Sequence, residues 1–267
     1  MPLVTDHRAG DVGAVLRAGI DAAGDVLHVV DPDAAVVKAL VDVLVTAVDP
    51  PETHVTTDEG TLKQATDEFL VASRAADLVT TGTLSLNADE TTGHTLLVAD
   101  EMVYAVVRMN NMVAALSTDD GEFVDTAVRA SRERARTAEG FSLRTPPLSR
   151  VRETLAETAG EEALADFDAA LDACQDIDVD VAEVTLSLLV AARNDVLLYD
   201  VSRWGEDVGI ASKATFSRTK SRLEEAGLVN TEKVPIEVGR PRLRLKAGAD
   251  EVRGDPATLA EVLQSFD

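Results

Sequence analysis

Residues 182–246 read AEVTLSLLVAARNDVLLYDVSRWGEDVGIASKATFSRTKSRLEEAGLVNTEKVPIEVGRPRLRLK. Gly209 follows a segment with apolar residues at helical spacing, and glycine ends a helix without steric cost because it has no side chain. Ser212 can cap a second helix, which Gly227 ends in turn. Two helices joined by a short glycine-containing turn form a helix-turn-helix. The inward positions are predicted to be Val201, Trp204 and Val208 in the first helix and Phe216, Thr219, Leu223 and Ala226 in the second.

The opposite face of the second helix carries small polar groups and cations, with no large apolar side chain. Small side chains let a helix approach the floor of a DNA major groove, and arginine can pair with guanine or hold a phosphate. For this helix taken alone, the alternative is an ordinary solvated surface. The residues predicted to contact DNA from this helix are Ser212, Lys213, Ala214, Ser217, Arg218, Ser221 and Arg222.

A cationic hairpin is predicted directly after this helix. Residues 228–234 and 242–246 have the pattern of strands, and two prolines and a glycine lie between them. A period of two places the cations of the second strand on one face and its leucines on the core. A charged exposed strand is the alternative, but a cationic hairpin after such a helix is typical of the wing of a winged helix. From this hairpin, the residues predicted to reach DNA are Arg240, Arg242 and Arg244.

Charge separates this segment from the rest of the chain. Residues 212–246 hold nine lysines and arginines against four acidic residues, a net charge of +5. Residues 1–211 carry −24 and residues 247–267 carry −4. Because the DNA backbone repels an acidic protein, the cationic segment must supply the attraction. We therefore predict double-stranded DNA as the partner.

The composition points to a folded protein from a salty environment. A chain of 267 residues with 45% hydrophobic side chains has the length for two domains and is not disordered. Acidic residues number 48, and lysine is rare, with six against nineteen arginines. Such an excess of carboxylates is tolerated where salt screens self-repulsion, so we interpret it as a halophilic habitat. The alternative, an acidic mimic of nucleic acid, conflicts with the cationic segment.

Cysteine and histidine usage argues against metal sites and disulfides. The single cysteine, Cys174, excludes an internal disulfide and a cysteine zinc cluster. His7, His28 and His54 are scattered, so no metal and no cofactor are predicted. No signal peptide opens the chain and no apolar run is long enough to span a bilayer. We expect a cytoplasmic protein without a membrane partner.

Upstream of residue 140, strands alternate with helices before a hairpin, which predicts an α/β domain with a mixed sheet. Strands are expected at 24–32, 54–57, 76–82, 95–99, 102–108 and 113–117, and helices at 9–22, 34–47, 60–75 and 119–140. Further helices are expected at 149–158 and 161–174, broken by Gly160, then at 182–193 and 256–266.

A ligand site is predicted at the end of the strand expected at 76–82, because open α/β sheets form crevices at strand ends. The hydroxyls of Thr80, Thr81 and Thr83 would there hydrogen-bond a small sugar or sugar phosphate as an effector. A polar loop is the alternative.

Two parts of the sequence carry a family resemblance. GIASKATFSRTKSRLEEAGLV, followed by EVGRPRLRL, is similar to winged-helix transcription regulators of archaea, and the whole chain resembles the haloarchaeal TbsP-type regulators. HTLLVADEMVYAVVR with ALSTDDGEFVDTAVRASRERA resembles the phospholipase-D-like sensor domain of TrmB-type regulators, over roughly 24–140. A catalytic member would need a histidine, a lysine two residues later and an aspartate five beyond that. Here His94 is followed by Leu96 and then Glu101, so we predict no enzyme and no catalytic residues.

Together these features predict a sequence-specific DNA-binding transcription regulator. We expect an α/β sensor-like domain over 1–140, a linker with connecting helices over 141–181, a winged helix-turn-helix over 182–246 and a tail helix over 247–267. A homodimer is expected, because dimers place two recognition helices about 34 Å apart on a pseudopalindrome. The resemblance adds control of glycolytic or gluconeogenic genes. The alternative function is a protein-interaction adaptor that docks on the transcription machinery through its winged helix.

Overall fold

The computed structural model describes residues 12–91, 93–109, 112–177, 179–235 and 241–266. The chain divides into two compact units. The first contains the residues up to Asp67 and Val71–Leu143, and the second contains Glu68–Leu70 and the residues from Arg144 onward. Within the described ranges, no helix is both long enough and apolar enough to cross a membrane.

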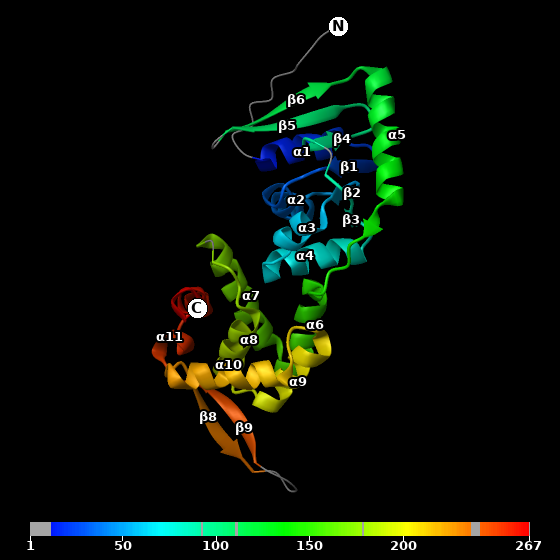
Figure 1. Ribbon diagram of the computed structural model, residues 1–267. Coiled ribbons are helices and arrows are strands. Elements are labelled where there is room, and N and C mark those ends of the chain that lie inside the picture. Colours follow the sequence, from blue (N-terminus) through cyan, green and yellow to red (C-terminus); the bar gives the residue numbers. More distant parts are fainter. Residues whose placement is uncertain (1–11, 92, 110–111, 178, 236–240, 267) are drawn as a thin grey trace. The chain divides into compact units, whose positions relative to one another are not determined.

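The first unit is built on a seven-stranded mixed sheet in the order β6-β5-β4-β1-β2-β3-β7 (Figure 1), which confirms the predicted α/β domain. β1, β2 and β3 run parallel, whereas β4, β5, β6 and β7 pair antiparallel with their neighbours. The strands are β1 (Val26–Val30), β2 (Glu52–Thr57), β3 (Leu84–Ala88), β4 (Leu96–Val98), β5 (Val103–Met109), β6 (Met112–Thr118) and β7 (Glu139–Gly140).

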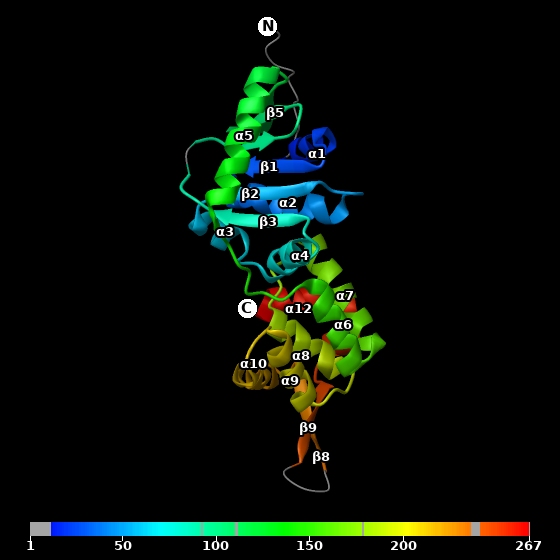
Figure 2. The same cartoon turned by 90° about the vertical axis from the view of Figure 1, so that its right-hand side faces the viewer.

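Helices cover both faces of this sheet. One face packs on the helices of the amino-terminal half, with Leu27, Leu40 and Leu97 in its core, and the other face packs on α5 through Val98, Val103 and Val124. Figures 1 and 2 show α5 alone on its side. The helices are α1 (Val12–Ala22), α2 (Ala34–Thr46), α3 (Glu59–Ala65), α4 (Phe69–Thr80) and α5 (Gly121–Thr137).

Two of the predicted elements in this unit are wrong. The helix expected at 60–75 is two helices, α3 and α4, and residues 76–80 continue α4 instead of forming a strand. A short apolar run fits a buried helix as well as a strand, because its length does not reveal its period. The real strand, β3, was missed although Leu84 and Leu86 alternate with polar residues and are buried.

The second unit is a helical bundle with a β-hairpin. Its core includes Phe167, Leu186, Trp204, Phe216 and Leu223, all of them buried. The predicted break at Gly160 is confirmed, since this residue lies between two helices with φ of +95°. The elements are α6 (Leu148–Ala159), α7 (Glu161–Asp176), α8 (Glu183–Arg193), α9 (Leu198–Val208), α10 (Lys213–Glu225), β8 (Val229–Val234), β9 (Arg242–Ala247), α11 (Asp250–Arg253), η1 (Pro256–Thr258) and α12 (Leu259–Phe266).

The tail differs in detail from the single helix predicted at 256–266. It consists of α11, the short 3₁₀ helix η1 and α12. Asp255 caps η1 by accepting a hydrogen bond from the Ala257 amide, and Pro256 fits at its first position. Leu259 and Leu263 of α12 are buried in the core of the second unit, so the tail helix packs within its own chain.

Gly205 lies where α9 and α10 pack closely against each other, and this contact can be tested. An added Cβ would lie 2.3 Å from two ring atoms of Phe216, a fully buried side chain. Gly205→Ala is therefore expected to lower the free energy of unfolding by about 1–3 kcal/mol in denaturant titrations, because overpacking forces side chains out of place.

The matched control is Gly121→Ala at the start of α5, where an added Cβ meets nothing within 4 Å. This change should stay within about 0.5 kcal/mol of the parent. Equal losses of stability in the two variants would contradict the close packing of Gly205 on Phe216.

Candidate nucleic-acid interface

The turn between α9 and α10 has the predicted glycine geometry. Gly209 lies in the left-handed region with φ of +96° and ends α9. The Ile210 amide then donates to the Gly205 carbonyl at 2.8 Å. The side chain of Ser212 caps α10 by accepting a hydrogen bond from the Thr215 amide at 3.2 Å. The roles predicted for Gly209 and Ser212 are thus confirmed, and Gly227 follows α10 with φ of +75°.

One face of α10 is buried and the opposite face is open to solvent. Phe216 and Leu223 are fully buried, while Thr219 is half-buried. Ala226, which was predicted to face inward, is exposed because the helix ends there. Of the residues predicted to contact DNA from α10, Ser221 is half-buried, and the exposed ones are Ser212, Lys213, Ala214, Ser217, Arg218 and Arg222.

The cations of this face differ in how they are held. Lys213 Nζ lies 2.6 Å from Glu206 Oε2 of α9, and this hydrogen bond lowers the pKa of Glu206 and raises the pKa of Lys213. Arg218 has a long hydrogen bond of 3.4 Å to Thr215 Oγ1. The guanidinium carbon of Arg222 lies 4.9 Å from the centre of the Phe266 ring. Arg218 and Arg222 therefore present positive charge that no carboxylate of the described ranges neutralises directly.

The hairpin after α10 has a second neighbour besides its own partner strand. β9 pairs with β8 along one edge. Along its other edge, Arg244 forms an isolated bridge with Leu197, and the Leu245 amide donates to the Val196 carbonyl at 2.9 Å. β8 packs on α10, and β9 packs on α8 and α9. The cationic strand β9 therefore lies between β8 and residues 196–197, which directly precede α9.

This neighbour supplies carboxylates to the cations of the wing. Lys246 Nζ lies 2.7 Å from Asp195 Oδ2, and Arg242 Nη1 lies 3.6 Å from Asp200 Oδ1. The Arg242 guanidinium also lies 4.2 Å from the centre of the Tyr199 ring. Arg244 is half-buried, and its Nε has no hydrogen-bond partner within the described ranges. Arg240, the fourth cation predicted for this wing, lies outside the described residues.

Sequence reasoning missed the acidic partners Asp195, Asp200 and Glu206. They precede the cationic segment, so a charge sum over 212–246 omits them. Residues 182–211 hold two basic and five acidic side chains, which lowers the net charge of the whole module to +2. The signal was present in the sequence, but only the fold shows which carboxylate meets which cation.

The structure removes the geometric reason for a ligand site at Thr80, Thr81 and Thr83. These residues end α4 and form the turn before β3, at the amino end of that strand rather than its carboxyl end. Two of the hydroxyls bind helix carbonyls, Thr80 Oγ1 to Ala76 at 2.8 Å and Thr81 Oγ1 to Leu78 at 3.0 Å. The Thr81 and Thr83 hydroxyls lie 3.0 Å apart. The hydroxyls of Thr80 and Thr81 therefore hydrogen-bond backbone carbonyls at the end of α4.

Several solved structures resemble part of this chain, among them the following three. TrmBL2, an archaeal chromatin protein, is 20% identical with a TM-score of 0.41; the match covers 53% of this chain and 55%, about half, of TrmBL2. Nuc, a phospholipase D family member from Salmonella typhimurium, is 12% identical with a TM-score of 0.37, and the match covers 52% of this chain and 95% of Nuc. NucT from Helicobacter pylori is 16% identical with a TM-score of 0.33, and the match covers 49% of this chain and 91% of NucT. No curated protein sequence matches.

Two family models divide the chain between them. The model described as the N-terminal part of TbsP-like transcriptional regulators matches residues 5–146. The model described as their C-terminal HTH domain matches residues 147–264. The chain therefore belongs to the TbsP-like transcriptional regulators.

Proposed function

We propose that this regulator recognises a specific double-stranded DNA sequence by placing α10 in the major groove. The observation that carries the proposal is the exposed face of α10, where Arg218 and Arg222 stand among serines and an alanine while Phe216 and Leu223 anchor the opposite face. Short side chains permit close approach, and the two guanidinium groups have the donors to pair with guanine or phosphate.

The remaining cations are assigned supporting roles in this proposal. Lys213 and Arg242 contact the phosphate backbone after exchanging their carboxylate partners for phosphate oxygens. Arg240 and Arg244 reach the adjacent groove or backbone from the wing. Phosphate contacts of this kind fix the position of a protein on the duplex, and base contacts from α10 carry the specificity.

Two copies of the chain would act together, because a single short helix reads few base pairs and a dimer doubles the site on a pseudopalindrome. The predicted targets are genes of sugar metabolism, and the effector is a small sugar or sugar phosphate; both rest on the resemblance to TbsP-type regulators. The excess of acidic residues supports a halophilic, haloarchaeal setting and a cytoplasmic site of action. The family description supports a regulator rather than an enzyme.

Removal of the Arg218 guanidinium tests the assignment of α10. Arg218→Ala should weaken binding to a duplex that the full-length protein selects from genomic fragments by about 1–3 kcal/mol, because a base or phosphate contact is lost. Fluorescence anisotropy measures the affinity. The matched control is Arg129→Ala on α5, where an exposed arginine makes the same 3.4 Å contact to a threonine hydroxyl, here Thr126.

Only the Arg218 variant should lose affinity. If both variants bind DNA like the parent, α10 does not read DNA and the adaptor alternative gains support.

Release of Lys213 from Glu206 tests the role of the ion pairs. Glu206→Gln should tighten DNA binding about two- to fivefold at low salt, since Lys213 no longer has to leave a carboxylate. Asp207→Asn is the control: it removes one negative charge from the same helix, but its carboxylate pairs with Arg203 at 3.3 Å. An equal gain in both variants would indicate general charge repulsion and not a specific hold on Lys213.

A further inference from the structure

The first unit contains a cavity that the DNA-binding function does not use. It has a volume of about 320 Å³ and opens where β1 and β2 end. The carboxyl ends of parallel strands are the edge at which open α/β sheets hold ligands. The loop after β1, the start of α3, the loop before β4 and strand β5 supply its walls. A volume at the lower end of small-molecule sites suits a ligand the size of a monosaccharide.

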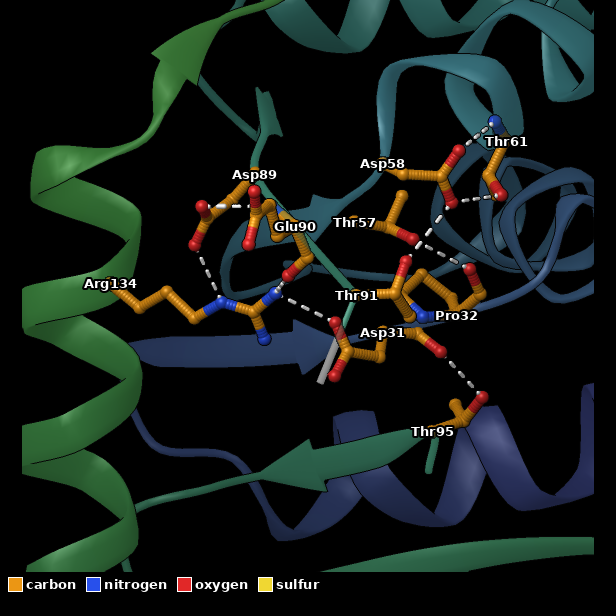
Figure 3. A network of polar contacts seen from close by, with 10 residues as sticks. All are labelled: Asp31, Pro32, Thr57, Asp58, Thr61, Asp89, Glu90, Thr91, Thr95 and Arg134. Atoms are coloured by element: carbon orange, nitrogen blue, oxygen red, sulfur yellow. Dashed lines mark hydrogen bonds and ion pairs between the residues drawn. The ribbon is translucent and has the colours of Figure 1, made fainter. Parts of the chain in front are cut away.

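The arginines at this edge are already engaged by aspartates. Arg108 Nη1 lies 2.5 Å from Asp33 Oδ2. Arg134, which comes from α5, donates from Nη2 to Asp31 Oδ1 and from Nε to Asp89 Oδ2, each at 2.8 Å (Figure 3). Arg134 also hydrogen-bonds the Glu90 carbonyl. A phosphate or carboxylate ligand would therefore have to displace an existing ion pair.

The threonine hydroxyls around the cavity have already donated their hydrogens. Thr57 Oγ1 donates to the Pro32 carbonyl at 3.0 Å, and Thr95 Oγ1 donates to the Asp31 carbonyl at 2.9 Å. Each hydroxyl has one hydrogen. Thr57 is buried, so the lone pairs of the half-buried Thr95 Oγ1 are the ones that remain for a ligand. Figure 3 shows both hydroxyls bound to the loop that follows β1.

Asp58 adds carboxylate oxygens to this set of acceptors. It caps α3 and accepts hydrogen bonds from the Thr61 amide at 2.9 Å, the Thr61 hydroxyl at 2.6 Å and the Thr91 hydroxyl at 3.2 Å. These donors and the helix amino terminus stabilise its negative charge, which keeps the pKa of Asp58 below its usual range. The walls of the cavity thus offer acceptors from several sides, and a ligand must bring the donors.

We propose that this cavity binds a polyhydroxylated molecule of monosaccharide size that carries no phosphate or carboxylate, through the oxygens of Asp58 and Thr95. Hydroxyl groups that point in several directions match acceptors that line several walls, whereas a phosphorylated sugar meets carboxylates and no unengaged cation in the described lining. This cavity takes the place of the threonines at the end of α4 as the predicted ligand site. Only the role of the bound molecule as the effector rests on the proposed function.

Three probes with one ring and different charge test the chemistry: glucose, glucose 6-phosphate and glucosamine, with fructose as a second neutral hexose. Each is titrated into the full-length protein by calorimetry without DNA. Glucose or fructose should bind, the phosphate ester should bind at least about tenfold more weakly, and the amine, whose cation meets the Asp58 carboxylate, should bind at least as tightly as glucose. The proposal is overturned if neither neutral hexose binds at millimolar concentration or if the phosphate ester binds tighter than both.

Two matched variants locate the site. Asp58→Asn should weaken hexose binding about tenfold, because an amide replaces a carboxylate acceptor while it still caps the helix. Asp120→Asn alters the equivalent cap of α5, where Asp120 accepts from the Phe123 amide at 3.0 Å, and should leave hexose binding unchanged. Thr95→Val serves as the second cavity variant if Asp58→Asn does not fold. Equal binding by the cavity variants and Asp120→Asn would place the hexose elsewhere.

DNA binding is measured on the same preparations without sugar. Retained DNA binding with no hexose binding would refute this inference and leave the proposed function intact. Hexose binding with no affinity for any genomic duplex would refute the proposed function and leave the cavity assignment standing.

Discussion

The contact between Gly205 and Phe216 determines which face of α10 the solvent meets. The ring of Phe216 occupies the space that a side chain at residue 205 would fill, so α9 and α10 pack closely. Leu223 is buried on the same side of α10. Once this side is fixed, the rotation of the helix is fixed too, and Ser217, Arg218 and Arg222 are exposed. The proposed DNA-reading surface is thus a consequence of apolar packing on the other side of the helix.

Electrostatics sets the second constraint on this protein. The chain carries a net charge of −23, and even its DNA-binding module reaches only +2. Carboxylates of α9 and the turn before it pair with Lys213, Arg242 and Lys246. In the proposed complex, DNA phosphates would compete with these carboxylates. Exposed ion pairs of this kind are weak, and salt weakens them further. Because Arg218 and Arg222 have no carboxylate partner to leave within the described ranges, they are expected to contribute most of the attraction.

Local signals in the sequence predicted the second unit well. Glycine, serine and apolar periodicity each act over a few residues, which is why Gly209, Ser212 and the break at Gly160 were placed correctly. In the first unit, the segment 76–82 was compatible with a strand and with a helix, because its few apolar residues do not reveal a period, and its first part belongs to α4. The cavity at the ends of β1 and β2 and the ion pairs of the wing join residues far apart in sequence, so only the fold reveals them.

The most direct test of the central claim is to identify the surface that touches DNA. A photoreactive azidophenacyl group is attached to Ser217→Cys on α10 or to Asp125→Cys on α5, both exposed positions, while the native Cys174 is fully buried. Irradiation of each protein with its selected duplex should crosslink DNA from position 217 and not from position 125. Crosslinking from position 125 alone, in a protein that still binds the duplex, would contradict the account.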